Sequence, residues 1–429
     1  MKIAIIGGAG VRVPLLVAGL AGSGLKIDEV VLYDTDRERL DIIAGLSLQM
    51  SQGVIVRAAL SPEHAVDGAS FVITSIRVGG AAERARDEAI AIAHDVIGQE
   101  TVGAAGFAAA VRTIPPMLAY GRMVAQRAPR AWLINFTNPV SIITQALHRE
   151  TDARVIGVCG TPMELFEDAA HAVGLPADVC SFDYFGLNHL GWLREIYFEG
   201  EPQLHRIWES DDKLLSAYRS PLFEPEMLRR LQLLPSDYLY YYYRTEAALE
   251  NLKRAGFSRG DLVEKMTTEF FRSAGSPERL VQVYGEYLDR RDRSYMQLET
   301  ASGPRLRPEW SELSGYDRIA FFTIRAIAMN RGDIIPLNVP NRGTLPFLDD
   351  DDIIETPCRV VDTGPQPRAV DEVPEVAQAL IERVKIYERA TIRAALTNDL
   401  QHLTDALALN PLVPSTEVAK ELVRNYFLN

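Results

Sequence analysis

The feature that most constrains the fold lies in the first 34 residues. An apolar, β-branched run over residues 2–6 is followed by a glycine-rich turn and by a predicted helix with Pro14 in its first turn. A second apolar run, over residues 29–33, ends at Asp34. The order strand, glycine turn, helix, strand, acid is typical of a dinucleotide-binding βαβ unit. In such a unit the glycines let the backbone approach a pyrophosphate at the helix N-terminus.

The turn and the end of the second strand supply the candidate contacts to a dinucleotide. Asp34 would accept hydrogen bonds from the adenosine ribose and would repel the 2′-phosphate of NADP, so NAD is the favoured cofactor. Because the turn departs from a strict G-x-G-x-x-G pattern, a βαβ unit that binds nothing stays open. We expect the cofactor-binding residues of this unit to be Gly7, Gly8, Gly10, Val11 and Asp34.

The composition excludes several classes of partner. The chain has 429 residues, of which 47% are hydrophobic and 24% charged, which suits a globular protein of two or more domains. A net charge of −13 argues against nucleic acid or an anionic membrane as the partner. The N-terminal apolar run is too short for a secretion signal, and three cysteines are too few for a disulfide framework, so we expect a cytoplasmic protein. No apolar stretch reaches about 18 residues, and we expect no membrane span.

Strands and helices alternate through the first 160 residues. Further strands are predicted over residues 53–58, 70–76, 131–135 and 155–158, with helices at about 37–52, 81–94 and 107–126. This alternation predicts a Rossmann-type doubly wound parallel sheet, in which ligands lie at the carboxyl ends of the strands. We therefore predict an NAD-binding domain over residues 1–160.

Beyond residue 160 the pattern is mainly helical. Short strands are predicted near 180–186 and 192–198, with another between 353 and 362. The loop over 334–352 is rich in Pro, Asn and Gly and ends in four aspartates, which we interpret as a solvated turn and not as a metal site. Residues 161–429 are predicted to form a second, mixed α+β and mainly helical domain, and the family resemblance given below implies that this is the catalytic domain that holds the substrate, the metal and the oligomer contacts. Its predicted helices cover residues 163–174, 225–254, 261–273, 277–297, 313–331, 372–408 and 415–427.

Four short motifs place polar residues near predicted strand ends. Each residue by itself is compatible with a structural role, since an isolated cysteine is usually a small core residue. Cys159 and His189 are 30 positions apart, which matches no structural zinc spacing. Two protein ligands would leave coordination positions open for substrate oxygens, as a catalytic metal requires. The motifs are VIGQETVGAAGF with Gln99 and Glu100, LINFTNPV with Asn135 and Asn138, VIGVCGTP with Cys159, and DYFGLNHLGW with Asn188 and His189.

Taken in order, these motifs resemble those of glycoside hydrolase family 4, most closely its 6-phospho-β-glucosidase branch. The resemblance runs nearly end to end and includes PSDYLYYYYRTE (235–246), SRGDLVEKM (258–266) and LNVPNRGTLPFLDDDDIIETPC (337–358). It implies a small-molecule glycoside as substrate, NAD and Mn²⁺ (or another divalent metal) as cofactors, and a homodimer or homotetramer. The family is an exception to the two-carboxylate scheme of glycosidases. The implied reaction oxidises C3 of the sugar with NAD⁺, removes the C2 proton, eliminates the aglycone, adds water and reduces C3 again.

The resemblance also implies roles for individual residues. Cys159 and His189 match the metal ligands, and Tyr238 matches the base that removes the C2 proton. Substrate contacts are expected at Arg84, Asn138, Asn188 and Arg259, and further cofactor contacts at Arg77, Gln99, Glu100 and Asn135.

Two positions depart from the family pattern. Gly160 stands where the family carries Asn or Asp, and a glycine cannot supply a general acid, which argues against an α-glycosidase. The stretch 314–320 lacks the family's Arg-Gly-Gly, and Arg318 is a candidate substitute. An unphosphorylated glycoside therefore stays open as the substrate.

Two other classes of function also stay open. One is an NAD-dependent 2-hydroxy-acid dehydrogenase, which shares the N-terminal architecture and needs no metal. The other is a non-catalytic sugar- or NAD-binding regulator descended from the family.

Overall fold

The N-terminal part of the chain forms a parallel sheet, as the sequence predicts. The computed structural model describes residues 1–51, 53–220, 222–275, 277–301 and 315–428. Six parallel strands lie in the order β3-β2-β1-β4-β5-β6. The strands are β1 (Lys2–Ile6), β2 (Glu29–Tyr33), β3 (Ile55–Ala58), β4 (Phe71–Thr74), β5 (Trp132–Asn135) and β6 (Arg154–Gly157).

Alternation along β1 explains why this strand lies at the centre of the sheet. Ile3 and Ile5 belong to one apolar cluster, Ala4 and Ile6 belong to another, and all four side chains are fully buried. Both faces of the strand are therefore covered, which is the usual state of a parallel sheet. The covering helices of this part are α1 (Val13–Gly22), α2 (Arg37–Met50), α3 (Pro62–Val66), α4 (Gly80–Ala93), α5 (Gly103–Arg127), α6 (Val140–Glu150) and α7 (Thr161–Ala172).

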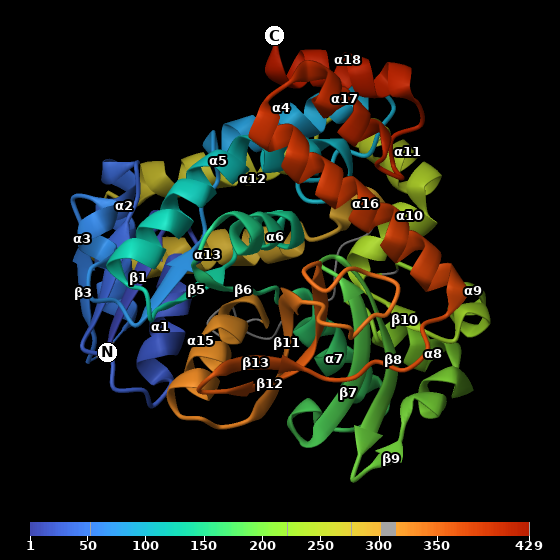
Figure 1. Cartoon of the computed structure of the whole chain (residues 1–429), viewed down its shortest axis with the longest axis horizontal. Coiled ribbons are helices and arrows are strands. Elements are labelled where there is room, and N and C mark those ends of the chain that lie inside the picture. Colours follow the sequence, from blue (N-terminus) through green and yellow to red (C-terminus); the bar gives the residue numbers. More distant parts are fainter. Residues whose placement is uncertain (52, 221, 276, 302–314, 429) are drawn as a thin grey trace.

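The C-terminal part returns to the same sheet. Strand β11 (Asp333–Pro340) pairs with β6, and β12 (Ile353–Val361) and β13 (Gly364–Pro367) extend the sheet in antiparallel fashion to nine strands. A second sheet contains β7 (Cys180–Leu187), β8 (Leu190–Phe198), β9 (Glu201–Pro202) and β10 (Leu234–Pro235). The predicted boundary at residue 160 falls between β6 and α7. Figure 1 shows the long sheet running from β3 at one end of the molecule to β11–β13, with the β7–β8 hairpin beside it.

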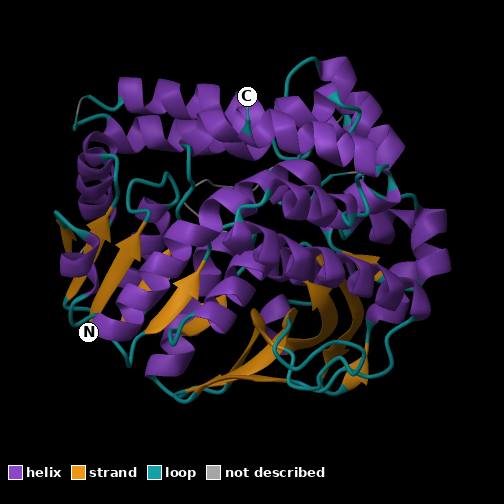
Figure 2. Cartoon of the chain, turned by 45° about the horizontal axis from the view of Figure 1, so that its top comes forward, coloured by secondary structure: helices purple, strands orange, loops and turns teal. Residues whose placement is uncertain are grey.

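Helices make up most of the remaining chain, which confirms the predicted fold class. The strands occupy one side of the molecule and long helices cover the other (Figure 2). The described residues include three 3₁₀ turns, η1 (Ala177–Val179), η2 (Leu204–Glu209) and η3 (Asp237–Leu239). The α-helices are α8 (Asp211–Ser216), α9 (Pro225–Leu231), α10 (Tyr240–Tyr243), α11 (Thr245–Ala255), α12 (Arg259–Ser273), α13 (Leu280–Arg293), α14 (Gln297–Thr300), α15 (Gly315–Ala328), α16 (Glu375–Thr397), α17 (Leu400–Ala408) and α18 (Thr416–Phe427).

Four sequence predictions of secondary structure were wrong. The single helix predicted over 372–408 is divided into α16 and α17, because Asn398 adopts a left-handed conformation (φ +51°) and ends α16, and Asp399 caps α17. The helix predicted over 225–254 is interrupted by β10, because Pro235 cannot continue a helix and Leu234 pairs with Leu193 of β8. The helix predicted over 277–297 is α13 alone and ends at Arg293. The loop predicted over 334–352 begins with β11, where Pro336 and Pro340 lie within a strand. Residues 313 and 314, the predicted start of α15, lie outside the described residues.

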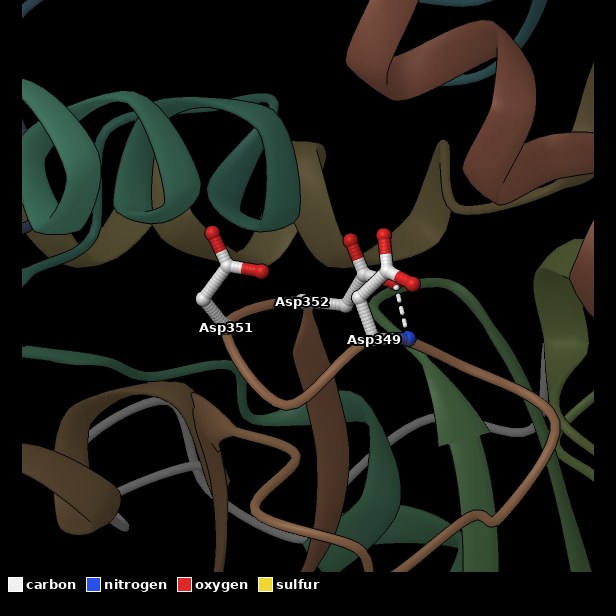
Figure 3. Close-up of side chains that lie close together, drawn as sticks. All are labelled: Asp349, Asp351 and Asp352. Carbon is white, nitrogen blue, oxygen red and sulfur yellow. Dashed lines mark hydrogen bonds between the residues drawn. The ribbon is translucent and has the colours of Figure 1, made fainter.

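The acidic end of that loop is only partly solvated. Asp349 is exposed, but Asp352 is fully buried and accepts a hydrogen bond from the Asp349 backbone N–H at 3.1 Å (Figure 3). Arg389 donates from Nε to Asp352 Oδ1 at 2.8 Å, and Arg149 donates to Asp351 at 2.6 Å. The negative charges of Asp351 and Asp352 are therefore offset by the arginines Arg149 and Arg389 of the chain.

Among the described residues, no helix is long and apolar enough to cross a membrane.

Candidate functional site

Residues from distant parts of the chain line one cavity of about 210 Å³ at the carboxyl ends of the parallel strands. The side chains on its wall come from β-strand ends on one side and from η3, α10, α12, α13 and α14 on the other. Nine residues that the sequence singled out lie on this wall: Arg77, Arg84, Gln99, Glu100, Asn138, Cys159, His189, Tyr238 and Arg259. The departing residue Gly160, at the N-cap of α7, lies there as well.

The glycine turn has the backbone geometry expected of a site that approaches a ligand closely. Gly7 has a φ of +92°, and a Cβ there would lie 2.2 Å from the carbonyl oxygen of Ser75. Asp34 accepts hydrogen bonds from the backbone N–H groups of Ala9 at 3.0 Å and Asp36 at 3.1 Å. Each carboxylate oxygen keeps a second lone pair for a ribose hydroxyl.

The turn joins the cavity through Arg12. Arg12, the residue before α1, lies on the cavity wall, whereas Gly7, Gly8, Gly10, Val11 and Asp34 do not. The phenol of Tyr284 in α13 donates to the Val11 carbonyl at 2.7 Å and ties α13 to the turn.

Four charged residues cross-link α4, the residue Glu100 before α5, and α12. Arg84 donates to Glu88 at 2.8 Å, and its Nη1 lies 2.8 Å from Glu100; Arg77 also pairs with Glu100. Burial raises the pKa of Glu100, but Arg77 and Arg84 outweigh burial and hold that pKa well below its ordinary value. The Gly260 N–H at the start of α12 donates to Glu88 at 2.6 Å. Arg84 is thereby fixed with its guanidinium at the cavity.

Two predicted cofactor residues have their polar atoms bonded to neighbouring parts of the chain. Gln99 lines the cavity, and its Oε1 accepts from the N–H groups of Thr101 at 2.7 Å and Val102 at 2.8 Å, just before α5. Asn135 is fully buried, does not line the cavity, and donates to Thr144 at 3.0 Å. In this arrangement Asn135 holds the loop after β5.

The proposed metal ligands and the proposed base are neighbours. The imidazole of His189 stacks on the Tyr238 ring with centroids 3.7 Å apart and planes 1° apart. His189 Nδ1 is buried without a hydrogen-bond partner among the described residues, and burial lowers the pKa of His189 to about 4. A neutral imidazole with an unused nitrogen is suited to bind a metal ion.

Burial also keeps the Cys159 thiol and the Tyr238 phenol protonated in the protein alone. Burial, with Glu355 as a smaller cause, raises the pKa of Cys159 to about 12. Burial, together with the charges of Glu100 and Cys159, raises the pKa of Tyr238 above its ordinary value. A divalent cation would offset both effects, because a bound cation favours thiolate and phenolate. The donor set therefore fits a divalent metal.

Apart from Arg259, the far wall of the cavity was not predicted from the sequence. Arg219 donates two hydrogen bonds to Asp292, at 2.7 and 2.8 Å. Arg259 donates to the Ser294 carbonyl and its guanidinium lies 5.5 Å from the centroid of the Tyr295 ring. The only sequence signal was the dense charge of DRRDRSYMQLE (289–299), which a solvated helix end explains equally well.

The cavity carries a positive excess although the chain is acidic. Six arginines line it against four carboxylates: Arg12, Arg77, Arg84, Arg219, Arg259 and Arg291 against Glu100, Glu164, Asp292 and Glu299. Anionic ligands are therefore favoured in the cavity of a chain with a net charge of −13.

The candidate substitute for the family's arginine lies elsewhere. Arg318 pairs with Glu167 and lines a separate cavity of about 540 Å³. It does not take the place of an arginine in the site. Residue 314 of the same stretch lies outside the described residues. Asn188 is buried beside His189 and bonds to Glu355, and it does not line the cavity.

Comparisons with known proteins agree with this geometry. The family model described as "Family 4 glycosyl hydrolase" matches residues 2–175, and that of its C-terminal domain matches residues 184–413. A probable 6-phospho-β-glucosidase of Bacillus subtilis (strain 168) is 30% identical, with 99% of this chain and 95% of the relative covered. A phospho-α-glucosidase of Clostridium acetobutylicum is 28% identical, covering 99% of this chain and 96% of the relative. The solved 6-phospho-β-glucosidase of Thermotoga maritima, with manganese, NAD⁺ and glucose-6-phosphate, has a TM-score of 0.86 at 28% identity, covering 100% of this chain and 98% of that one.

Proposed function

The chain belongs to family 4 of the glycosyl hydrolases, and on this premise we propose that it is an NAD- and divalent-metal-dependent glycosidase acting on 6-phospho-β-glucosides. The observation that carries the proposal is the contact between His189 and Tyr238 in the cavity that also contains Cys159. A metal-ligating pair beside a phenol is the arrangement that C2 deprotonation requires.

The protein side chains divide the work of this reaction. Tyr238 would accept the C2 proton, and Cys159 and His189 would hold the cation. When bound, NAD⁺ supplies a reversible hydride acceptor for C3, and the divalent metal supplies a Lewis acid for the oxygens at C2 and C3. Arg84 and Asn138 would orient the glycone, and the turn at Gly7–Gly10 with Asp34 and Arg12 would bind the dinucleotide.

The positive excess of the cavity supports an anionic glycone. Arg219 is matched by Asp292, whereas Arg259 donates to a neutral carbonyl. Arg291 also donates to a neutral group, the phenol of Tyr287, at 2.8 Å. A 6-phosphate would give these two guanidinium groups an anionic hydrogen-bond partner, through the bidentate geometry that arginine offers.

An unphosphorylated glycoside is the second candidate substrate, favoured by Gly160 and by the position of Arg318 outside the cavity. A 2-hydroxy-acid dehydrogenase is not favoured, because both family models that match the chain describe glycosyl hydrolases. A non-catalytic regulator would not need the Tyr238 contact with His189.

Nitrophenol release from aryl β-glucosides, with and without a 6-phosphate, tests the proposal. Each assay is run with and without NAD⁺, Mn²⁺ and a thiol reductant. We expect cleavage of the phosphorylated substrate only when NAD⁺ and metal are both present. NAD binding without turnover of any glycoside would favour the regulator instead.

A pair of tyrosine variants assigns the base. Tyr238→Phe should abolish cleavage and also deuterium incorporation from D₂O at C2, because the proton acceptor is lost. Tyr242→Phe is the matched control, because Tyr242 lies four residues away and does not line the cavity. Equal effects of the two substitutions would contradict the assignment.

We also infer a cytoplasmic enzyme, because its three cysteines are unpaired and two of them are buried. A homodimer or homotetramer is the expected assembly, and size-exclusion chromatography with light scattering measures it.

A further inference from the structure

The carboxyl group of Glu355 connects the two segments that carry the proposed metal ligands. Glu355 belongs to β12 and is 1% exposed. Its Oε1 accepts hydrogen bonds from Asn338 Nδ2 at 2.8 Å and from Asn188 Nδ2 at 3.3 Å, and its Oε2 accepts from the Tyr184 hydroxyl at 2.9 Å. In the described part of the chain, these three donors are all neutral groups.

Two of these donors lead directly to a proposed ligand. Asn188 directly precedes His189 in the β7–β8 turn. Asn338 lies opposite Gly157 where β11 pairs with β6. Gly157 is two residues before Cys159 in the sequence. A Cβ at Gly157 would lie only 2.8 Å from the Asn338 Cβ, so the two strands pack tightly at this point. Glu355 is therefore hydrogen-bonded to Asn188, beside His189, and to Asn338, which packs against the strand that leads to Cys159.

The acceptor character of Glu355 decides which way the Asn188 amide faces. An amide can present either its oxygen or its nitrogen to a neighbour, and carboxylate oxygens accept hydrogen bonds. Facing Glu355, the amide presents its nitrogen, and Asn188 Oδ1 is left buried without a partner in the described residues. His189 Nδ1 is in the same state. Two unpartnered polar atoms in consecutive residues are expected where bound groups complete a network.

Glu355 does not form a ready-made three-residue ligand cluster with Cys159 and His189. Within the described ranges, the only group of three or more His, Cys, Asp or Glu residues with ligand atoms all within 4.8 Å of one another is the Asp349, Asp351 and Asp352 cluster. We therefore consider Glu355 as a group behind the ligands. Groups behind the ligands commonly fix ligand orientation, and their loss weakens metal binding by about 10–100-fold.

We propose that Glu355 is a positioning residue that fixes the Asn188 side chain next to His189 and the Asn338 strand contact near Cys159, and so prepares the Cys159–His189 pair for a divalent cation. This inference rests on the proposed function, because it assumes that the pair binds a metal. Glu355 would then affect the affinity for the metal and would take no part in the chemical step.

Cobalt binding to the purified full chain tests the inference without turnover. Co²⁺ alone is titrated into the protein, and the sulfur-to-cobalt absorption band gives both the Kd and the presence of the Cys159 ligand. Glu355→Gln keeps the shape of the side chain but replaces one acceptor oxygen by an NH₂ group, which must face at least one of three donors. NAD binding, followed by fluorescence, and circular dichroism report the fold.

We expect Glu355→Gln to raise the Kd for Co²⁺ by about 10–100-fold with NAD binding retained. The matched control is Glu388→Gln, which alters another buried carboxylate, 5% exposed and bonded to Ser141 at 2.8 Å, outside the cavity. Circular dichroism checks that this control folds, because the substitution also breaks the buried pair with Lys385. The control should leave the Kd within about twofold. Asn188→Ala should weaken cobalt binding to a similar extent, and the double variant should be no weaker than either single variant, since both act through one contact.

The outcomes separate this inference from the proposed function. If the wild type binds Co²⁺ through sulfur and Glu355→Gln binds it equally well, or if the two substitutions add, the positioning role is overturned and the proposed function stands. If the wild type shows no sulfur-to-cobalt band, the metal site and the inference fail together. If Glu355→Gln does not fold, Asn188→Ala decides, and a wild-type Kd in that variant overturns the role.

Discussion

Replacing Arg259 by Met should reveal whether the glycone carries a phosphate. Arg259 opens α12, and its position is set from two sides: Nη1 donates to the Ser294 carbonyl, and the guanidinium lies over the Tyr295 ring. Ser258 and Asp261 cap this helix end with reciprocal hydrogen bonds, so the substitution should leave the backbone in place. The change then removes one guanidinium from the far wall of the cavity.

The size of the effect follows from the kind of contact. A hydrogen bond to a charged group contributes about 1.5–3 kcal/mol, which corresponds to a loss of about 10–150-fold in kcat/KM. We expect this loss for an aryl 6-phospho-β-glucoside only. The plain aryl β-glucoside has no charge at C6, so its kcat/KM should change by less than about threefold.

The assay is nitrophenol release from both substrates, with saturating NAD⁺ and Mn²⁺, at several ionic strengths. Arg272→Met is the matched control, because Arg272 lies in the last turn of the same helix and is exposed. The ratio of the two kcat/KM values is the decisive quantity. An equal loss on both substrates would refute the reasoning and place Arg259 in the support of the fold, and a wild type that prefers the plain glucoside would refute the phosphate itself.

Three further outcomes follow from named contacts. Burial lowers the pKa of His189 to about 4 from 6.5, so the unfolded chain takes up a proton at a higher pH than the folded, metal-free protein. The free energy of unfolding should therefore be unaffected by this group above pH 6.5 and should fall by about 3 kcal/mol as the pH drops to 4. Urea unfolding of the wild type and of His189→Gln should show different pH dependence in this window, and the same pH dependence if the shift is absent. Lys385→Met should lower the free energy of unfolding by about 3–5 kcal/mol, because the buried Lys385 donates to the Ile353 carbonyl at 2.7 Å and pairs with Glu388. Calorimetry should show a Tm lower by about 3–6 °C, whereas the surface control Lys213→Met should lower Tm by about 1 °C. Similar Tm shifts for the two variants would contradict the prediction. Gly160→Asn should fold normally, because Gly160 has φ −77° and ψ −18°, a conformation that any residue adopts. One added hydrogen bond from the new side chain in the cavity should raise kcat/KM by up to about tenfold. A loss of activity would mean that the substrate occupies the space next to Gly160.

The sequence by itself determined the N-terminal half of the fold. The continuous apolar runs, the glycine turn and Asp34 are local patterns, and the structure has β1, α1 and β2 at these places. The carboxyl ends of parallel strands meet at one edge, so Arg77, Asn138 and Cys159 could be assigned to one site before any contact was known.

The boundaries in the C-terminal part were less predictable. The sequence of β11 contains two prolines and predicts a loop. In the structure, β11 pairs along its whole length with β12 and pairs with β6 at Asn338. A strand is stabilised by its neighbours as much as by its own residues, so local propensity gave the wrong answer here.

Only the tertiary structure decided the far wall of the cavity and the support behind the metal ligands. Arg219 meets Asp292 across 73 positions, and Asn188 meets Glu355 across 167. Sequence periodicity reports which face of one element is buried, but it carries no information on which distant element covers that face. The chemistry of the site could therefore be predicted from residues at strand ends, whereas the charge around the glycone and the orientation of Asn188 depend on contacts that exist only in the folded chain.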